Sequence, residues 1–408
     1  MSAKKVDIKQ SILWNTWGSG FYLAAQWAAT VFTTRILGYE DAGIFSLAMS
    51  VTNIFYAFSV YGMRNYQISD FREKYSAGEY LVSRIWTGLV ALLLCVLFCF
   101  ANAYDFKQMV CINLYMVYKL TETIFVLFLG IYQKRWRMDY MGKSMTLRGL
   151  VMLICFPIII YLSGSLEMAI LVVALLSGIL LWLYDVKRIK SLESISMKVT
   201  SASVFKLLRE CLPLCVYLVL NTSMGSVPKY FLEFYRGSEQ LGIYSSVATP
   251  TLIVQMAATY IFNPLITTFS EKYAEGNRKE FGNVFLKCVM AIGVISLVAL
   301  VGAKLFGRMG LYILYGDTIL KYEYLLMPLV ICTILTAVFW FFSSVLTVVR
   351  EFKGLIFGVC LATVGTAIAC MVCIPLYGMQ GATAGLIFGL IVGCIPLAIC
   401  LKRKIDQI

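Results

Sequence analysis

Long apolar segments separated by short polar connections dominate the hydrophobic pattern of this 408-residue chain. Crossing the hydrocarbon of a bilayer takes roughly 20 apolar residues in an α-helix, and twelve segments meet or approach that length. They lie near residues 12–36, 43–62, 82–103, 109–131, 149–163, 166–186, 210–228, 241–266, 284–303, 324–349, 355–375 and 380–401. The pattern therefore predicts an all-α polytopic membrane protein with about twelve transmembrane helices.

The connection after the first segment recurs in the second half of the chain. Glu40-Asp-Ala-Gly-Ile-Phe-Ser46 matches Glu239-Gln-Leu-Gly-Ile-Tyr-Ser245 at an offset of 199 residues (239 minus 40). Each copy is an acidic turn that ends in Gly before an apolar helix, so one helical hairpin is used twice. Six helices per half would give two lobes related by a pseudo-twofold axis along the membrane normal. We expect an N-terminal six-helix lobe over 1–188, a cytoplasmic linker over 189–205 and a C-terminal six-helix lobe over 206–408.

Composition supports a membrane protein. Hydrophobic residues make up 60% of the chain, charged residues 14%, and the mean hydropathy is +0.80. An ordinary soluble domain is nearer 45–50% apolar, so that class is excluded. Three lysines precede the first segment, which has full length and lacks a small-residue cleavage site. We therefore expect this segment to remain as a helix that begins in the cytosol.

The placement of the basic residues predicts the orientation. Of 35 Lys and Arg residues, 27 fall in alternate connections counted from the N-terminus or within four residues of them, and the connection 132–148 is one of these. This asymmetry is the positive-inside signal, which predicts a multi-pass protein with both termini cytoplasmic. Anionic membrane lipids near those connections account for the net charge of +13, so nucleic acid is not expected as a partner.

The sequence contains no recognisable motif for catalysis or cofactor binding. The chain has no His, and its 13 Cys lie in or beside apolar segments, where free Cys packs as a small hydrophobe. Cys370-Met-Val-Cys373 has the spacing of a metal site but lies in such a segment. Gly142-Lys-Ser144 resembles the end of a nucleotide-binding loop, yet Arg137 stands where the upstream Gly belongs. The sequence predicts no cofactor, no metal and no catalytic residue, hence a transporter rather than an enzyme.

Ionisable residues within the spans are the first candidates for a substrate-binding site, because such groups usually face a bundle interior or a wet cavity. Lys119 and Glu122 are three residues apart in the fourth segment, so they share a helical face and could pair. Either they hold helices together or they line a cavity. Arg35 and Arg64 end the first and second segments, where they either snorkel to the interface or contact a ligand.

The seventh segment is the most irregular of the twelve. Within Asn221-Thr-Ser-Met-Gly-Ser-Val-Pro-Lys229, Gly225 and Pro228 weaken a helix. Transporters place binding sites at broken helices, which makes Asn221 and Lys229 candidates. A structural kink is the alternative.

Four stretches resemble the polysaccharide flippases of the multidrug/oligosaccharidyl-lipid/polysaccharide exporter superfamily. Three of them follow the first, second and fourth predicted helices, and the fourth lies at the end of the seventh segment. The stretches are Arg35-Ile-Leu-Gly-Tyr-Glu-Asp-Ala-Gly43, Tyr61-Gly-Met-Arg-Asn-Tyr-Gln-Ile-Ser-Asp70, Tyr132-Gln-Lys-Arg-Trp-Arg-Met-Asp139 running on to Ser144 and Leu147-Arg-Gly149, and Pro228-Lys-Tyr230.

This resemblance implies two six-helix lobes that face each other across a central cavity and open alternately to each side. It also implies a location, the bacterial plasma membrane, and a substrate, an oligosaccharide carried on undecaprenyl pyrophosphate. The protein would move this lipid from the inner to the outer leaflet for surface polysaccharide synthesis. Such a cargo calls for a cationic cavity, to which Arg35, Arg64, Lys119 and Lys229 could contribute, and Arg35 matches the family's arginine near the end of the first helix. The Lys119–Glu122 pair has no secure counterpart in the family.

Two alternatives stay open. An ion-coupled multidrug or cation antiporter of the same superfamily would need unpaired intramembrane carboxylates, and Glu122 is the candidate near mid-membrane. For either kind of transporter, H⁺ and Na⁺ are the candidate coupling ions. A membrane polysaccharide polymerase or ligase would need a large outer loop, whereas the longest outer connection, Lys304–Glu323, has about 20 residues.

Overall fold

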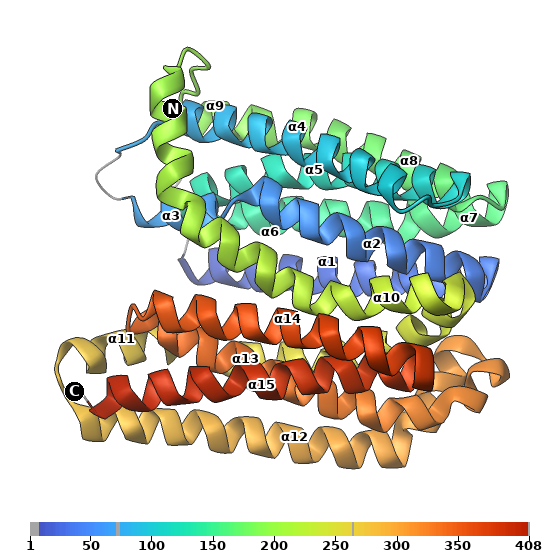
Figure 1. The fold of residues 1–408 in the computed structure, drawn as a ribbon. Coiled ribbons are helices and arrows are strands. Elements are labelled where there is room, and N and C mark those ends of the chain that lie inside the picture. Colours follow the sequence, from blue (N-terminus) through green and yellow to red (C-terminus); the bar gives the residue numbers. More distant parts are fainter. Residues whose placement is uncertain (1–7, 71–73, 263–264, 407–408) are drawn as a thin grey trace. The chain divides into compact units, whose positions relative to one another are not determined.

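The computed structural model describes residues 8–70, 74–262 and 265–406, and every regular element in these ranges is helical. Contacts divide the chain into two units, Met1–Thr222 and Ser223–Ile408. Figure 1 shows the helices of both units, coloured from blue to red along the sequence. The predicted all-α fold class is thus confirmed.

The first unit contains all helices up to the beginning of α10. These are α1 (Ile8–Leu37), α2 (Tyr39–Val60), α3 (Met63–Ser69), α4 (Ala77–Ala101), α5 (Phe106–Lys134), α6 (Met138–Leu150), the π-helix η1 (Val151–Cys155), α7 (Phe156–Ser163), α8 (Leu166–Leu180), the π-helix η2 (Leu181–Val186) and α9 (Lys187–Leu192). The helix α10 (Ser201–Phe262) begins in this unit and continues into the second.

The second unit contains the rest of α10 and the later helices. These are α11 (Ile266–Ala274), α12 (Arg278–Tyr315), the 3-10 helix η4 (Asp317–Leu325), α13 (Leu326–Val348), α14 (Phe352–Tyr377) and α15 (Met379–Asp406). The division at Thr222 lies within α10, whereas the sequence predicted a boundary in the linker 189–205.

Each predicted span is helical over most of its described residues, although α2, α4 and α13 end one or two residues before the spans predicted for them. Among the residues that the structure describes, nine helices are long and apolar enough to cross a membrane. The predicted spans outside this set lie in α1 and α10, which carry more polar residues, Asn15 and Asn221 among them.

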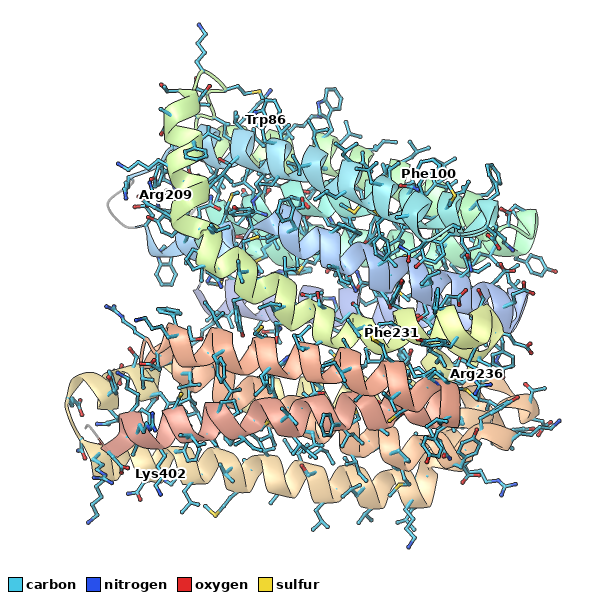
Figure 2. All side chains as sticks on the ribbon, viewed as in Figure 1. Trp86, Phe100, Arg209, Phe231, Arg236 and Lys402 are labelled. Carbon is cyan, nitrogen blue, oxygen red and sulfur yellow. The ribbon has the colours of Figure 1, made fainter. Side chains whose placement is uncertain are left out.

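The outer surface of the first unit is rich in large apolar side chains. On α4, Trp86 is 60% exposed and Phe100 is 65% exposed, and Figure 2 shows both pointing away from the helix bundle. An apolar surface of this kind is stable in contact with lipid rather than water. The chain is a multi-pass membrane protein.

Two glycines explain the repeat found in the sequence. Gly38 lies between α1 and α2 with φ 93° and ψ −176°, and Gly237 interrupts α10 with φ 82° and ψ 173°. This backbone region is open essentially only to glycine. The two positions are 199 residues apart, the offset of the matching segments. The same turn therefore ends a helix and begins the next one in both halves.

This break in α10 differs from the predicted one. The residues from Asn221 to Lys229, including Gly225 and Pro228, are helical, and the non-helical backbone within α10 lies at Gly237. The prediction that the helix is broken near Gly225 and Pro228 is wrong, because the helical hydrogen bonding continues past the proline.

The fifth span is longer than its apolar run. The predicted cytoplasmic connection 132–148 is mostly helix: α5 ends at Lys134, and α6 begins at Met138. Glycines allow α6 to lie close against α1. A Cβ on Gly18 would come within 2.1 Å of the Gly142 carbonyl oxygen, and a Cβ on Gly142 within 2.0 Å of the Trp14 carbonyl oxygen. Small residues at such contacts let membrane helices approach closely.

Side-chain caps set the beginnings of α4 and α5. Ser76 and Glu79 form a reciprocal capping box before α4, and Asp105 and Gln108 form another before α5. Each box satisfies backbone N–H groups that a helix leaves free in its first turn. These caps fix where α5 begins and therefore which of its residues face the interior of the unit.

Candidate functional site

A buried ion-pair network joins three helical segments of the first unit. Arg148 on α6 donates from Nη1 to Glu122 Oε1 on α5 at 2.8 Å and from Nη2 to Asp185 Oδ2 in η2 at 3.3 Å. The side chains of Arg148 and Asp185 are 1% and 0% exposed. The guanidinium also lies 4.0 Å from the centroid of the Phe125 ring. We call Glu122, Arg148 and Asp185 the triad.

Hydroxyl groups complete the coordination of both carboxylates. Tyr22 on α1 donates to Glu122 Oε2 at 2.8 Å, and its hydroxyl lies 2.6 Å from that of Tyr118, where either can donate. Tyr132 donates to Asp185 Oδ1 at 3.2 Å, and Ser144 donates to Asp185 Oδ2 at 3.0 Å. Buried charges require such partners, since each unsatisfied lone pair weakens the fold.

Two π-helical segments adjoin the triad. Arg148 lies three residues before η1, and Asp185 lies within η2. A π-bulge inserts an extra residue into a helix and rotates the following side chains, and such bulges are frequent at functional sites. The helical segments that carry Arg148 and Asp185 therefore depart from regular α-helical geometry at or close to these charged residues.

The triad combines two carboxyl groups with one guanidinium, so its formal charge is −1. Arg148 keeps its charge at any pH a protein meets. The predicted pairing of Lys119 with Glu122 is not what the structure shows, because Glu122 pairs with Arg148 instead.

Lys119 contacts aromatic rings. Its ammonium lies 4.9 Å from the centroid of Tyr56 and 5.5 Å from that of Tyr115. Within the described residues it takes part in no salt bridge, although the charge of Glu122 acts on it. Aromatic faces attract a cation without neutralising it. The Lys119 ammonium therefore faces aromatic rings rather than a carboxylate.

Arg84 on α4 is the most deeply buried cation. It is 0% exposed, and its Nη1 donates to the Thr123 carbonyl oxygen at 3.1 Å. Its Nε and Nη2 have no hydrogen-bond partner among the residues that the structure describes. A buried charge without a counter-ion is strongly unfavourable, so this arginine is a candidate for binding an anion.

Arg64, at the beginning of α3, extends the same positive region. It is partly buried and donates from Nη2 to Gln133 Oε1 at 3.1 Å. The hydroxyl of Tyr56 lies in the electrostatic field of both Arg64 and Arg84. Because the Tyr56 ring also contacts Lys119, this tyrosine connects the three cations. We call Arg64, Arg84 and Lys119 the cationic cluster.

The predicted site residues thus have different fates. Arg64, Lys119 and Glu122 lie together inside the first unit, while Arg35 is exposed in the last turn of α1. Asn221 and Lys229, both partly buried in α10, fall on either side of the division between units. Their part in a site stays a prediction.

Arg84, Arg148 and Asp185 were missed by sequence reasoning. Arg84 stands alone in the apolar run 82–103, which was a usable signal for an intramembrane charge. Arg148 was assigned to a basic cytoplasmic connection, and Asp185 to the end of a span. Only the packing of α5, α6 and η2 shows that these two residues meet.

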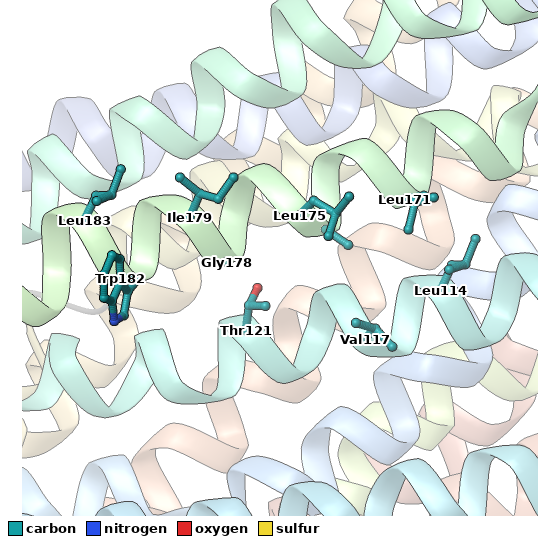
Figure 3. A pocket seen from close by; sticks show the side chains of 10 residues that line it. Leu114, Val117, Thr121, Leu171, Leu175, Gly178, Ile179, Trp182 and Leu183 are labelled. Carbon is teal, nitrogen blue, oxygen red and sulfur yellow. The ribbon is translucent and has the colours of Figure 1, made fainter.

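The surface of the first unit also has an apolar groove of about 610 Å³ between α5 and the α8–η2 segment. Figure 3 shows its lining side chains on these two helices, with Thr121 between Val117 and Trp182. Such a lining suits a hydrocarbon chain and not a charged headgroup. Within the described residues, no cluster of His, Cys, Asp and Glu suits a metal ion either.

Comparison with known sequences gives two matches. A family model described as polysaccharide biosynthesis protein matches residues 8–271, which is more than half of the chain. The capsular polysaccharide biosynthesis protein CapF of Staphylococcus aureus is 24% identical over 281 residues, 68% of this chain and 69% of that protein.

Comparison with solved structures identifies the fold. A multidrug resistance MATE family transporter of the MOP superfamily in an inward-facing conformation has a TM-score of 0.75 at 12% identity, over 97% of this chain and 98% of that one. The lipid II flippase MurJ, in an inward closed conformation, also has a TM-score of 0.75 at 12% identity, over 97% and 89%. The chain has the fold of MOP superfamily transporters.

Proposed function

The chain belongs to the polysaccharide biosynthesis protein family, and from this we propose that it is a flippase for undecaprenyl-pyrophosphate-linked oligosaccharide. It moves this lipid from the inner to the outer leaflet of the bacterial plasma membrane by alternating access, for surface polysaccharide synthesis. In this proposal, twelve transmembrane helices form two six-helix lobes, and both termini are cytoplasmic.

The observation that carries the proposal is the cationic cluster. Arg64, Arg84 and Lys119 place three positive charges inside the first unit without a carboxylate in salt-bridge contact among the described residues. Together with the triad, four positive and two negative charges leave a net charge of +2. The phosphate bridge of the substrate carries two negative charges, so its binding would neutralise this net positive charge in the interior of the first unit.

The chemistry of the cluster fits phosphate groups. The planar fork of an arginine donates two parallel hydrogen bonds to phosphate oxygens, and a lysine adds a mobile point charge. The unsatisfied Nε and Nη2 of Arg84 are donors that a phosphate could accept from. We assign the phosphate bridge to the cluster, and further contacts to Arg35, Asn221 and Lys229 as the substrate moves.

The same cluster disfavours the antiporter alternative. A site for cationic drugs needs negative charge at the ligand, whereas the unpaired interior charges here are positive. Glu122 is not available to such a ligand, because Arg148 and Tyr22 occupy its carboxylate oxygens.

The experiment is a flipping assay with purified full-length protein in liposomes that contain lipid-linked oligosaccharide. Access of a membrane-impermeant glycan-modifying enzyme to the lipid measures the transfer between leaflets. We expect wild-type vesicles to expose the glycan over time, and Arg35→Ala and Arg84→Met vesicles to do so at least about tenfold more slowly, as loss of a charge-assisted contact predicts. Wild-type rates equal to those of protein-free vesicles would overturn the proposal.

A further inference from the structure

The apolar groove between α5 and the α8–η2 segment offers contacts to hydrocarbon. Three of its lining side chains, Leu175, Ile179 and Trp182, are 58%, 50% and 69% exposed. The hydroxyl of Thr121, the only one in the lining, donates to the Tyr118 carbonyl oxygen at 2.7 Å and is therefore satisfied within its own helix. The indole N–H of Trp182 is the other polar side-chain group of the lining. Such a groove favours an apolar chain over a sugar or a phosphate.

The length of the groove matches a lipid chain within one leaflet. On the α8–η2 segment the lining runs from Leu171 to Leu183, and these twelve steps (183 minus 171) of helix rise about 18 Å. Half of the hydrocarbon core of a bilayer is about 15 Å. Figure 3 shows Trp182 and Leu183 at one end of the groove and Leu171 and Leu114 at the other. Tryptophan is typical of the membrane interface, so the end at Trp182 is where a headgroup would lie.

Small residues keep the middle of the groove open. Ala174 and Gly178 of α8 belong to its lining. A Cβ on Gly178 would have Thr121 Cγ2, at 3.9 Å, as its one described neighbour within 4 Å, which is an ordinary van der Waals contact. The space beside Gly178 is therefore free for another molecule, and a larger side chain at this position would occupy it.

Basic residues follow the groove along the same helix. Lys187 comes four residues after Leu183, and Lys190 comes three residues after Lys187, so both lie on the side of the helix that carries the groove. Both lysines are exposed, and neither forms a salt bridge within the part of the chain that the structure describes. Arg188, by contrast, stacks at 5.4 Å on the ring of Tyr140 of α6. The groove thus ends at two lysines whose charge is free to attract an anionic headgroup.

The groove and the cationic cluster lie on opposite faces of α5. The Lys119 ammonium contacts the ring of Tyr56 of α2, whereas Val117 and Thr121, two residues before and after it, line the groove. Two residues correspond to about 200° around an α-helix. A hydrocarbon tail attached to a phosphate at Lys119 would have to pass around α5 to enter the groove. The geometry therefore favours a separate lipid molecule over the tail of the transported lipid.

We propose that the groove binds one acyl chain of an anionic phospholipid of the inner leaflet, whose phosphate lies at Lys187 and Lys190. The proposal takes from the proposed function only the orientation, which makes the Trp182 end cytoplasmic, and not the substrate. A lipid that binds the folded chain stabilises it. Because Asp185 of η2 pairs with Arg148 of α6, a lipid on this segment would also stabilise the helices that carry the triad.

The test measures quenching of tryptophan fluorescence by brominated acyl chains in vesicles that contain the full chain. Brominated phosphatidylglycerol is the anionic probe, and phosphatidylcholine with the same chains is the zwitterionic probe. The difference between wild type and Trp182→Phe isolates the signal of Trp182. Trp86→Phe gives the matched signal for a tryptophan on α4 that is 60% exposed and lies outside the groove.

Trp182 should distinguish the two lipids. We expect its quenching to reach half of its maximum at a mole fraction at least about tenfold lower for phosphatidylglycerol than for phosphatidylcholine, as two lysines near the surface predict. Quenching of Trp86 should rise equally with both lipids.

A double variant tests the headgroup contact. Lys187→Gln combined with Lys190→Gln should reduce the quenching of Trp182 by phosphatidylglycerol to that by phosphatidylcholine. Both lysines are exposed, so the variant should fold. Lys198→Gln combined with Lys206→Gln is the matched control, because it removes two exposed lysines of the same connection that do not follow the groove. This control should behave as wild type.

A second variant tests the acyl chain. Gly178→Leu fills the groove and should abolish the preference of Trp182 for phosphatidylglycerol. Gly293→Leu is the matched control: Gly293 lies in α12, and a Cβ there has no described atom within 4 Å. It adds the same side chain elsewhere and should keep the preference.

Three results would overturn the proposal. The first is an equal dependence of Trp182 quenching on the two lipids in wild type, and the second is a preference that the Lys187→Gln, Lys190→Gln variant retains. The third is displacement of the brominated phosphatidylglycerol by undecaprenyl phosphate at a lower mole fraction than by unbrominated phosphatidylglycerol, which would assign the groove to a polyprenyl tail.

The flipping assay separates this proposal from the proposed function. Vesicles that expose glycan while Trp182 shows no preference would retain the flippase and remove the lipid site. A preference at Trp182 without glycan exposure would retain the lipid site and remove the flippase.

Discussion

Arg148 Nη1 lies 2.8 Å from Glu122 Oε1 in the interior of the first unit, and this contact holds α6 against α5. The two residues are 26 positions apart and were assigned by sequence to a cytoplasmic connection and to a span. Their pairing shows that part of the predicted connection packs inside the first unit as α6, where a buried guanidinium needs the carboxylates beside it.

Arg148→Met should destabilise the protein by about 3–5 kcal/mol, because it leaves two buried carboxylates without a cation. Thermal unfolding in detergent measures the change. Arg135→Met is the matched control: this arginine lies 3.6 Å from Glu193 with its side chain 44% exposed, and surface pairs contribute about 0–1 kcal/mol. Equal melting temperatures for the two variants would contradict a stabilising role of Arg148.

Arg84→Met should leave the melting temperature unchanged or higher while weakening pyrophosphate binding. Removal of a buried charge without a counter-ion relieves its desolvation, and this gain offsets the loss of the hydrogen bond to Thr123. Calorimetry measures the pyrophosphate binding, and thermal unfolding of the same sample measures the melting temperature. A marked loss of stability with binding intact would assign Arg84 to structure instead.

Lys119→Met should slow flipping at least about tenfold, and Lys119→Arg should retain most of the activity, since arginine also stacks on aromatic rings and binds phosphate. The assay is glycan exposure in vesicles. Lys107→Met serves as a control on the same helix. Lys107 lies at the beginning of α5 and pairs with Asp41 of α2, so it is not part of the cationic cluster. A flipping rate of Lys119→Met equal to that of wild type would show that Lys119 is not part of the site.

Gly18→Val should prevent correct folding, because its Cβ would lie 2.1 Å from the Gly142 carbonyl oxygen and force α1 away from α6. Overpacking of this kind typically costs about 1–3 kcal/mol, and here the neighbour is rigid backbone. Gly20→Val is the control, since a Cβ there has no described atom within 4 Å. Size-exclusion profiles and melting temperatures report the result, and similar behaviour of both variants would argue against the close contact.

Transport in sealed vesicles should respond to an ion gradient and not to ATP. Gly142-Lys-Ser144, which resembles the end of a nucleotide-binding loop, lies within α6, where Gly142 packs against the backbone of α1 and cannot cradle phosphates. Flipping rates with imposed gradients, with and without ATP, measure this. If the purified protein alone required ATP for flipping, transport driven by an ion gradient without ATP would be excluded.

The sequence by itself predicted the class of the fold and the approximate positions of the long apolar helices, but not the helices in the connections, such as most of α6. Apolar segments long enough to span a bilayer admit few structures other than helices, because lipid offers no partner for a free backbone group. The repeat at Glu40 and Glu239 indicated a turn shared by both halves, and the structure places the glycines that form it two residues earlier, at Gly38 and Gly237.

Tertiary structure alone decided which charges are paired. Lys119 and Glu122 share a helical face, yet Glu122 pairs with Arg148, 26 positions away in the chain, and Arg84 is left buried with two unsatisfied donors. Helical spacing shows which residues share a face but not what that face meets. The partner of a buried charge depends on the close packing of helices far apart in sequence, which here is set by contacts such as Gly18 against Gly142.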